Sequence, residues 1–289
     1  MQEIIVPAEI RAWSRAARKR GQRVGLVPTM GFLHEGHMRL VDRAKERTDR
    51  VALSIFVNPL QFGAGEDFTS YPRDLAHDRQ LAAERGVDCL FLPDTAAMYP
   101  ATPTIRLAAG PMGATLEGAA RPGHFDGVLT VVAKLFHLIE PDIAFFGRKD
   151  FQQATLVRRM VADLDFALEV AVHATVREVD GLALSSRNRY LTADQRRQAV
   201  ALSRALRAVE QAWRGGQAEP AALTRRGMEV LSAPGVSPEY VALVGEDGQP
   251  VPRADARTVV AVAAGVGRTR LIDNVVLGEG VAADPVVRG

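Results

Sequence analysis

The first 175 residues alternate between short apolar runs and amphipathic stretches, and this alternation limits the fold more than any other feature. Apolar runs that are typical of buried strands occupy residues 24–28, 51–57, 87–92, 142–146 and 167–172. Helical patterns occupy residues 38–48, 73–85, 124–139 and 149–164. Strand, helix and strand at this spacing predict a parallel sheet with right-handed crossovers. Ligands of such sheets bind at the carboxyl ends of the strands.

The pattern changes in two places. Residues 93–123 are rich in proline and glycine, and we expect loops and short strands there. Beyond residue 175, stretches 192–214 and 219–232 are typical of helices, with a turn at 215–220 between them. Strand-like runs follow at 238–244, 257–266 and 269–277. Hairpin-connected strands with helices predict a smaller α+β domain after the parallel sheet.

Composition excludes several classes of protein. The 289 residues carry a net charge of +2 without a basic run, so charge gives no support for nucleic-acid binding. No apolar run approaches the ~18 residues of a membrane span, and the N-terminal stretch does not have the pattern of a signal peptide. A single cysteine, Cys89, excludes an intrachain disulfide framework and a cysteine-rich zinc site. We therefore expect a cytoplasmic location, with Cys89 as a core thiol.

The first stretch that carries chemistry is VPTMGFLHEGHMRLV, where a strand ends and a helix begins near Glu35. His34 and His37 are three residues apart, so they share one face of the first helical turn. A helix N-terminus at this edge of a sheet favours anions, and two imidazoles there are suited to donate to phosphate oxygens. Gly31 and Gly36 let the backbone approach a ligand. Zinc is a weaker alternative, because no third ligand lies near.

Three further stretches place polar residues after strands. Gln61, in SIFVNPLQF, lies just beyond a strand, where its amide is suited to hold a small hydroxy acid. The stretch DIAFFGRKDFQQ delivers Lys149 to the same edge, and Gln153 lies one helical turn later. Only four of the 36 basic residues are lysine and the other 32 are arginine, so a lysine here suggests that an ammonium is required. The last stretch, LALSSRNRYL, offers loop donors for a triphosphate.

Together these four stretches resemble the pantothenate synthetase family, within the HxGH nucleotidylyl-transferase superfamily, from about Val24 to Leu191. The resemblance implies a Rossmann-like parallel-sheet domain at 1–175 that binds ATP and pantoate. It also implies a smaller α+β domain at 176–289 that closes over the site. The implied reaction is ATP-dependent ligation of pantoate and β-alanine to pantothenate through a pantoyl-adenylate, releasing AMP and pyrophosphate. Mg²⁺ and a homodimer are implied as well, whereas neither a nucleic acid nor a membrane is an expected partner.

The resemblance also assigns roles to individual residues. His37, His34 and Lys149 are the implied catalytic residues, with no metal ligand among the protein's side chains. Gln61 and Gln153 are implied to hold pantoate, with Gln61 also near β-alanine. The implied ATP site comprises Met30, Gly31, His34, Gly36, His37, Gly147, Lys149, Asp150, Val176, Leu184, Ser185, Ser186 and Arg187. Arg121 and His124 belong to a further matching stretch near the mouth of the pocket.

One residue departs from the family pattern, because Arg148 stands where glutamate is usual. Its position beside Lys149 predicts a side chain that faces away from the nucleotide, and any ion pair of the usual glutamate is put in doubt. Two other functions remain open on the sequence. One is transfer of AMP to an acceptor without amide formation, and the other is nucleotide binding without catalysis. The intact histidines, lysine and glutamines disfavour the second.

Overall fold

The computed structural model describes residues 1–287, which form two compact units. Among the described residues, unit 1 comprises 1–147 and 156–173, and unit 2 comprises 148–155 and 174–287. The sequence predicts a boundary after residue 175, whereas the units divide after residue 173. Residues 148–155, which include Lys149 and Gln153, belong to unit 2 even though they follow directly on a strand of unit 1.

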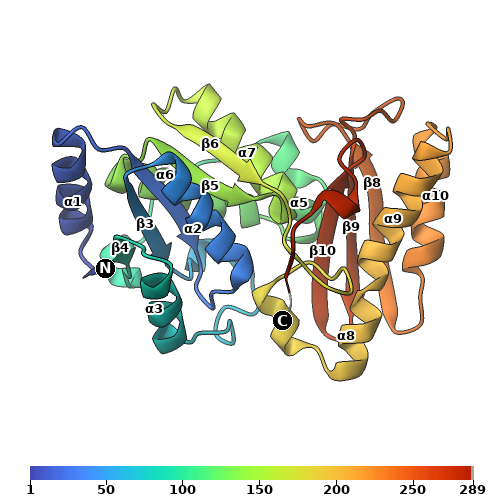
Figure 1. The fold of residues 1–289 in the computed structure, drawn as a ribbon, viewed down its shortest axis with the longest axis horizontal. Coiled ribbons are helices and arrows are strands. Elements are labelled where there is room, and N and C mark those ends of the chain that lie inside the picture. Colours follow the sequence, from blue (N-terminus) through green and yellow to red (C-terminus); the bar gives the residue numbers. More distant parts are fainter. Residues whose placement is uncertain (288–289) are drawn as a thin grey trace. The chain divides into compact units, whose positions relative to one another are not determined.

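Unit 1 is built on a six-stranded, entirely parallel sheet, as the alternating pattern predicts (Figure 1). The strand order is β1-β4-β3-β2-β5-β6. The strands are β1 (Gln2–Ile4), β2 (Val24–Thr29), β3 (Arg50–Ile55), β4 (Cys89–Phe91), β5 (Ile143–Gly147) and β6 (Glu169–His173). The central strands are almost completely buried, so their apolar runs are continuous rather than alternating.

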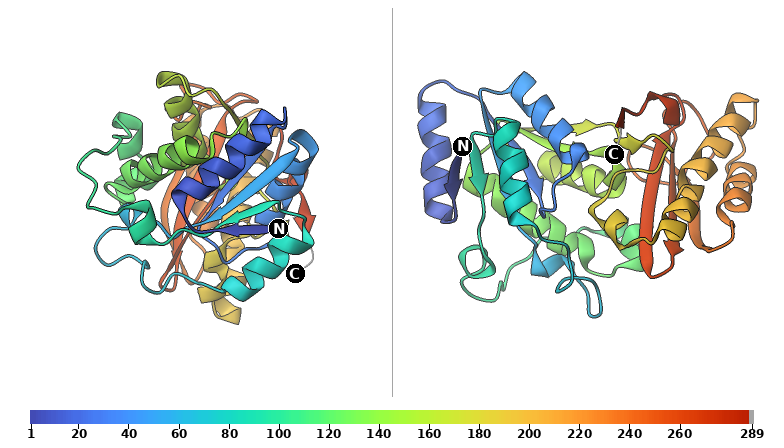
Figure 2. Two further views of the ribbon diagram at one scale, coloured as in Figure 1. Left: turned by 90° about the vertical axis from the view of Figure 1, so that its left-hand side faces the viewer. Right: turned by 60° about the horizontal axis from the view of Figure 1, so that its bottom comes forward.

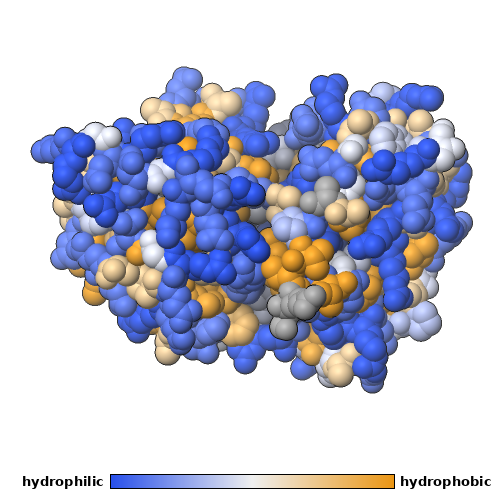
Figure 3. Space-filling view, in the orientation of Figure 1, coloured by the Kyte–Doolittle hydropathy of each residue, from blue (hydrophilic) through white to orange (hydrophobic). Residues whose placement is uncertain are grey.

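Helices cover both faces of this sheet, with α2 and α3 on one face and α1 and α6 on the other (Figure 2). The long helices are α1 (Pro7–Lys19), α2 (Glu35–Arg47), α3 (Leu75–Glu84), α6 (His124–Ile139) and α7 (Phe151–Asp163). The outward side of α2 is predominantly hydrophilic (Figure 3), with exposed ion pairs such as Arg43–Glu46. Four of these helices match the predicted ones within three residues at each end.

Two regions of unit 1 differ from the prediction. The sequence analysis does not anticipate β1 and α1, although Pro7 at the helix start and buried Ile10, Ser14 and Ala17 give α1 an amphipathic pattern. The expectation of short strands within residues 93–123 is wrong. That segment forms short helical turns at α4 (Thr95–Met98), η2 (Pro111–Ala114) and α5 (Glu117–Ala120). Asp94 caps α4 by accepting a hydrogen bond from the Ala97 amide, which favours a helical turn.

Unit 2 contains the predicted antiparallel strands, β8 (Val236–Val244), β9 (Val259–Val266) and β10 (Thr269–Val276), in the order β10-β9-β8. Helix α10 (Pro220–Leu231) also agrees with the prediction. The single helix expected at 192–214 is instead α8 (Ala193–Ala199) and α9 (Ala201–Arg214). Residues 199–203 are all buried, and one straight helix cannot turn five consecutive residues toward one core.

Short elements complete the fold. They are η1 (Pro59–Gln61), η3 (Arg148–Asp150), β7 (Arg177–Glu178), η4 (Ser186–Tyr190), η5 (Val281–Ala283) and β11 (Val286–Val287), with β7 and β11 paired in parallel. The apolar core of unit 2 lies between its helices and its three-stranded sheet, where Leu206 and Val209 pack with Val260 and Val262. This core holds β10 and its neighbouring segments in place.

A buried guanidinium lies at the centre of unit 2. The Arg177 side chain is 1% exposed and donates five hydrogen bonds, as many as it has N–H groups. Two go to Asp273 at 2.6 and 3.0 Å, and one goes to Asp284 at 2.8 Å. Burial opposes the positive charge, but the two carboxylates outweigh it and hold the pKa of Arg177 above its usual value. Arg177 thereby ties β7 to β10 and to the C-terminal segment.

We predict that Arg177→Met lowers the free energy of unfolding by about 3–5 kcal/mol, because it leaves Asp273 and Asp284 buried without their cation. Urea denaturation of the variant and of wild type measures the difference. Arg226→Met is the matched control, since the Arg226–Glu229 pair is exposed and is expected to contribute less than about 1 kcal/mol. Equal losses in the two variants would contradict the role given to Arg177.

Candidate active site

Two histidines lie where the loop after β2 meets the start of α2, at the carboxyl edge of the parallel sheet. His34 is the N-cap of α2, and its Nδ1 accepts a hydrogen bond from the Gly36 amide at 3.1 Å. The Nδ1 of His37 accepts from the His34 amide at 3.3 Å, so the two rings form a reciprocal capping box. Their ring centroids are 4.1 Å apart. The structure thus brings His34 and His37 together at a helix start, as predicted.

These contacts determine where the ring protons lie. A ring nitrogen that accepts a hydrogen bond carries no proton, so each neutral ring carries its N–H at Nε2. Two Nε2–H donors next to a helix N-terminus give a site of positive potential. This arrangement is suited to stabilise charge that develops on a phosphate oxygen.

The same loop is shaped by an aspartate that sequence reasoning missed. Asp78, on α3, is buried and accepts hydrogen bonds from the Phe32 and Leu33 amides at 2.9 and 2.6 Å. Burial raises the pKa of Asp78 above its usual value, although both amides favour the charged form. Gly31 has φ +84°, and a Cβ there would lie 2.8 Å from Ile55 and 3.0 Å from Asp78. Only glycine fits this approach without strain.

Gln61 lies at the end of η1, just past β3, and its side chain faces the interior. It is 7% exposed, so it is not a solvent-facing loop residue. Its Oε1 accepts from Asn58 Nδ2 at 3.1 Å, and its Nε2 donates to the Met30 sulfur at 3.3 Å. Asn58 in turn accepts from the Tyr99 hydroxyl at 3.0 Å. These contacts fix the orientation of the Gln61 amide and bring it to Met30, another predicted site residue.

Asn58 is a residue whose role the sequence analysis did not identify. A signal for it exists, since asparagine followed directly by proline is typical of the start of a helical turn. Its Nδ2 also donates to the Gly127 carbonyl at 3.0 Å. A Cβ on Gly127 would lie 2.2 Å from the Leu60 carbonyl oxygen, so only glycine lets α6 approach η1 this closely.

Arg121 and His124 hold the main chain at Gln61. His124 Nδ1 donates to the Gln61 carbonyl at 2.8 Å, and its Nε2 accepts from Arg121 at 3.0 Å. Arg121 also donates to that carbonyl and makes an ion pair with Glu66 at 2.6 Å. Hydrogen bonding from Arg121 holds the pKa of Glu66 below its usual value. Burial, aided by the Arg121 charge, lowers the pKa of His124 to about 4.

The other predicted residues of this group follow β5. Gly147 ends β5 opposite His173 of β6. In unit 2, Lys149 and Asp150 form η3, and the Lys149 ammonium lies 3.4 Å from the Asp150 carboxylate. Gln153 lies in the first turn of α7, four residues after Lys149.

A second group in unit 2 surrounds η4. The Leu184 amide donates to the Val176 carbonyl at 2.9 Å, which brings two predicted nucleotide-site residues together. Ser185 is the N-cap of η4, and its hydroxyl accepts from the Arg187 amide at 3.3 Å. Ser186 is buried within the turn. This loop is therefore ordered by its own backbone and hydroxyl contacts.

Arg148 forms ion pairs with two carboxylates of unit 2. Its guanidinium lies 2.5 Å from Glu279 and 3.2 Å from Asp284, and its side chain is largely buried. Arg148 thus forms ion pairs of its own with these two acids. A glutamate here would instead face two carboxylates. Asp284 links this pair to Arg177, since it accepts from both arginines.

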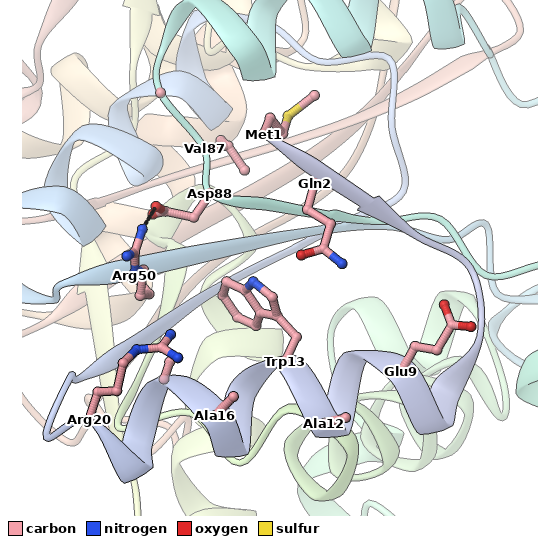
Figure 4. Close-up of a pocket in the computed structure, with 12 residues that line it drawn as sticks. Met1, Gln2, Glu9, Ala12, Trp13, Ala16, Arg20, Arg50, Val87 and Asp88 are labelled. Carbon is pink, nitrogen blue, oxygen red and sulfur yellow. Dashed lines mark hydrogen bonds and ion pairs between the residues drawn. The ribbon is translucent and has the colours of Figure 1, made fainter.

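The hollow shown in Figure 4 lies at the opposite, amino edge of the unit 1 sheet. It has a volume of about 830 Å³ and lies between α1 and the starts of β1, β3 and β4. Trp13 faces it, and Arg50 and Asp88 form an ion pair at its wall (Figure 4). No predicted site residue lines it, so it is separate from the histidine pair.

Two searches of residues 1–287 bear on the remaining expectations. No helix in this range is long and apolar enough to cross a membrane. The same residues contain no cluster of three or more histidine, cysteine, aspartate or glutamate side chains arranged to hold a metal ion.

Comparison with known proteins identifies the family. The sequence model of the pantoate–β-alanine ligase family matches residues 3–276. A pantothenate synthetase of Moorella thermoacetica is 51% identical over 273 residues, covering 93% of this chain and 96% of the relative. A pantothenate synthetase structure from Thermus thermophilus is 47% identical with a TM-score of 0.91, covering 96% of this chain and 99% of that one.

A third relative has been crystallised with ligands. It is the pantoate–β-alanine ligase of Francisella tularensis, complexed with β,γ-ATP and β-alanine. It is 33% identical with a TM-score of 0.82, covering 97% of this chain and 99% of that chain.

Fold and site define an α/β protein with a histidine-capped helix start at the carboxyl edge of a parallel sheet. Within that class, the chain belongs to the pantoate–β-alanine ligase family and is a ligase. The resemblance noted from four sequence stretches is thereby confirmed, and the family match extends beyond Leu191 to residue 276.

We predict that His124 makes stability depend on pH. Above about pH 6.5 the ring is neutral in both states, so it contributes no slope. Between about pH 6.5 and 4 the unfolded chain binds a proton that the native site excludes, so stability falls as pH falls, by up to about 3 kcal/mol. Arg121, Glu66 and Glu117 are the charged groups that act on the ring.

Urea unfolding of wild type and His124→Asn from pH 7 to 4.5 measures this slope, which is expected to be shallower in the variant. His137→Asn is the matched control, because His137 lies exposed on the same helix, α6. If His124→Asn and His137→Asn kept the same slope, the neutral buried state of His124 would be refuted.

Proposed function

We propose that this chain joins pantoate and β-alanine to form pantothenate in an ATP-dependent reaction through a pantoyl-adenylate. Membership of the pantoate–β-alanine ligase family supports the overall ligation. The adenylate step is supported by one observation in particular, the pair of Nε2–H donors of His34 and His37 at the start of α2. The Francisella relative, complexed with β,γ-ATP and β-alanine, supports both ligands as substrates.

The proposed chemistry has two steps. A pantoate carboxylate oxygen attacks the α-phosphorus of ATP, and the bond to the bridging oxygen breaks, so pyrophosphate leaves. The amine of β-alanine then attacks the acyl carbon, loses a proton and displaces AMP, which forms the amide. Neither step requires a nucleophilic side chain. Catalysis therefore depends on positioning and on stabilising charge at the transferring phosphoryl group.

In unit 1, His34 and His37 donate to phosphate oxygens as negative charge develops on them. Met30, Gly31 and Gly36 form the adjoining wall of the ATP site, with Gly31 fixed by its positive φ. Gly147 belongs to the same site at the end of β5.

Pantoate carries hydroxyl and carboxylate groups, which need both donors and acceptors. Gln61 and Gln153 each supply a carbonyl oxygen and an NH₂ group. The contacts of Asn58 and Met30 orient the Gln61 amide before substrate binds. Gln61 also contributes to the β-alanine site.

In unit 2, Lys149 supplies a compact positive charge to the phosphates, next to Asp150. The η4 loop supplies Ser185, Ser186 and Arg187 as further donors to the nucleotide. Val176 and Leu184 complete the ATP site through the backbone segment that they form together.

Mg²⁺ enters this proposal only as part of the substrate. Phosphate oxygens and water are the ligands proposed for the ion, since Mg²⁺ usually keeps several waters and binds through substrate phosphates. When bound to ATP, Mg²⁺ neutralises charge on the leaving pyrophosphate. The proposal also includes a homodimer and a cytoplasmic location, and both are supported by the family resemblance alone.

Pantoate-dependent exchange between ATP and labelled pyrophosphate tests the first step, and β-alanine-dependent release of AMP tests the second. We expect both activities. Exchange without amide formation would instead identify a nucleotidyl transferase. Absence of exchange with every acid tested would identify a nucleotide-binding protein without catalysis.

We predict that His37→Ala slows adenylate formation by ~10²–10³, the usual effect of removing one donor to a transition state. The melting temperature is expected to change by only a few degrees, since the lost capping contact contributes about 1 kcal/mol. Single-turnover assays measure the rate. His137→Ala is the control, and an unchanged rate in His37→Ala would overturn the assignment.

We also predict that Lys149→Arg lowers pantoate-dependent exchange at least ~10-fold although it keeps the charge. A guanidinium is wider and planar, whereas an ammonium is a compact charge that can follow the phosphate oxygens as the bond breaks. Lys149→Ala is expected to be worse, because it removes the charge. Lys19→Arg makes the same change at an exposed helix end and is expected to be silent. Full activity in Lys149→Arg would show that any cation suffices.

A further inference from the structure

The side chain of Lys149 has few contacts that fix its position. Among residues 1–287, its ammonium contacts the Asp150 carboxylate at 3.4 Å, a long hydrogen bond to a half-exposed partner. The Lys149 side chain itself is 20% exposed. With so weak a polar tether, the position of the ammonium depends strongly on the backbone from which the side chain extends. The placement of the η3 turn therefore decides where the ammonium lies.

One buried amide holds that turn. The Nδ2 of Asn274 donates to the carbonyl oxygens of Arg148 and Lys149, at 2.8 and 2.9 Å. Of the two ends of the amide, only the NH₂ group can donate hydrogen bonds to two carbonyl oxygens. These neighbours therefore determine the orientation of the amide. Asn274 lies in β10, paired with Ala261 of β9, and is 2% exposed. The turn is thus attached to a strand of the unit 2 sheet.

Asn274 is itself held rigidly. Its amide donates to Asp273 at 2.8 Å, and its carbonyl accepts from Arg177 at 3.2 Å. Arg177 in turn binds Asp273 through two hydrogen bonds. The buried Arg177 cluster therefore fixes the residue that fixes the η3 turn.

The Oδ1 atom does not explain an asparagine here. Asparagine is disfavoured in strands, and the Asn274 Oδ1 is buried without a hydrogen-bond partner in the described part of the chain. A buried polar atom in that state costs free energy that an apolar side chain of similar volume would avoid. The benefit must come from the NH₂ group, and both of its contacts are on the turn that carries Lys149.

We propose that Asn274 is a positioning residue for Lys149, which sets the ammonium in place for the phosphoryl-transfer step. This inference rests on the proposed role of Lys149. Asn274 does not contact substrate in this proposal, because it acts only through the carbonyl groups of Arg148 and Lys149.

Asn274→Leu tests the proposal, because it removes both hydrogen bonds with little change in volume. We expect the rate of adenylate formation to fall at least ~10-fold at saturating substrates, with the KM for pantoate within about threefold of wild type. The melting temperature is expected to fall by several degrees, because two carbonyl oxygens lose their donor and removal of the unpartnered Oδ1 offsets only part of that loss. A wild-type rate in this variant would overturn the proposal.

A double-mutant cycle with Lys149→Ala separates positioning from general structural damage. If Asn274 acts through Lys149, Asn274→Leu changes the rate by less than about twofold once the lysine is absent. Equal fold losses in both backgrounds would overturn the proposal. Leu271→Ala, a core truncation in the same strand, is the control and is expected to act equally in both backgrounds.

Single-turnover assays with enzyme in excess over labelled ATP keep the slow double variant measurable. The result is also distinguishable from failure of the proposed function. In that case wild type itself would form no adenylate from pantoate and ATP, or Lys149→Ala would be as fast as wild type.

Discussion

The charge of Arg177 is the constraint on which unit 2 depends. A guanidinium that is 1% exposed is tolerated only with complete pairing, and Asp273 and Asp284 supply it from β10 and from the C-terminal segment. Asp284 also binds Arg148. Asn274, whose carbonyl accepts a hydrogen bond from Arg177, donates through its side-chain amide to the backbone of the η3 turn. One buried ion cluster thus fixes three chain segments and, through them, the lysine proposed to act on ATP.

In unit 1, hydrogen bonds likewise hold polar side chains in fixed orientations, but these side chains are neutral. His34 and His37 cap α2 with their Nδ1 atoms, so the position of the remaining ring proton is determined before a ligand arrives. The Gln61 amide is held by Asn58 and Met30, and its main chain is held by His124. Polar groups oriented in advance need little reorganisation during a reaction, and this makes them effective at stabilising a transition state.

Local sequence patterns predicted many of the helices and strands, because the forces behind these patterns act between residues that are close in the sequence. Continuous apolar runs indicated β2, β3 and β5, and the start of α2 next to His34 followed from the strand-to-helix change. The same reasoning failed where the deciding contacts are not local. The break at Val200 reflects burial of five consecutive residues, and the helical turns within residues 93–123 depend on caps such as Asp94.

The sequence by itself determined the parallel sheet and the pair of histidines at its carboxyl edge. Hydrophobic periodicity and helix capping act within a few residues, so they can be read from the chain. Tertiary structure alone decided which buried polar groups meet. Gln61 and His124 are 63 residues apart, Arg177 and Asp284 are 107 apart, and Lys149 and Asn274 are 125 apart. Such pairs form because packing brings buried donors and acceptors together where water cannot replace either partner, and no local pattern encodes that geometry.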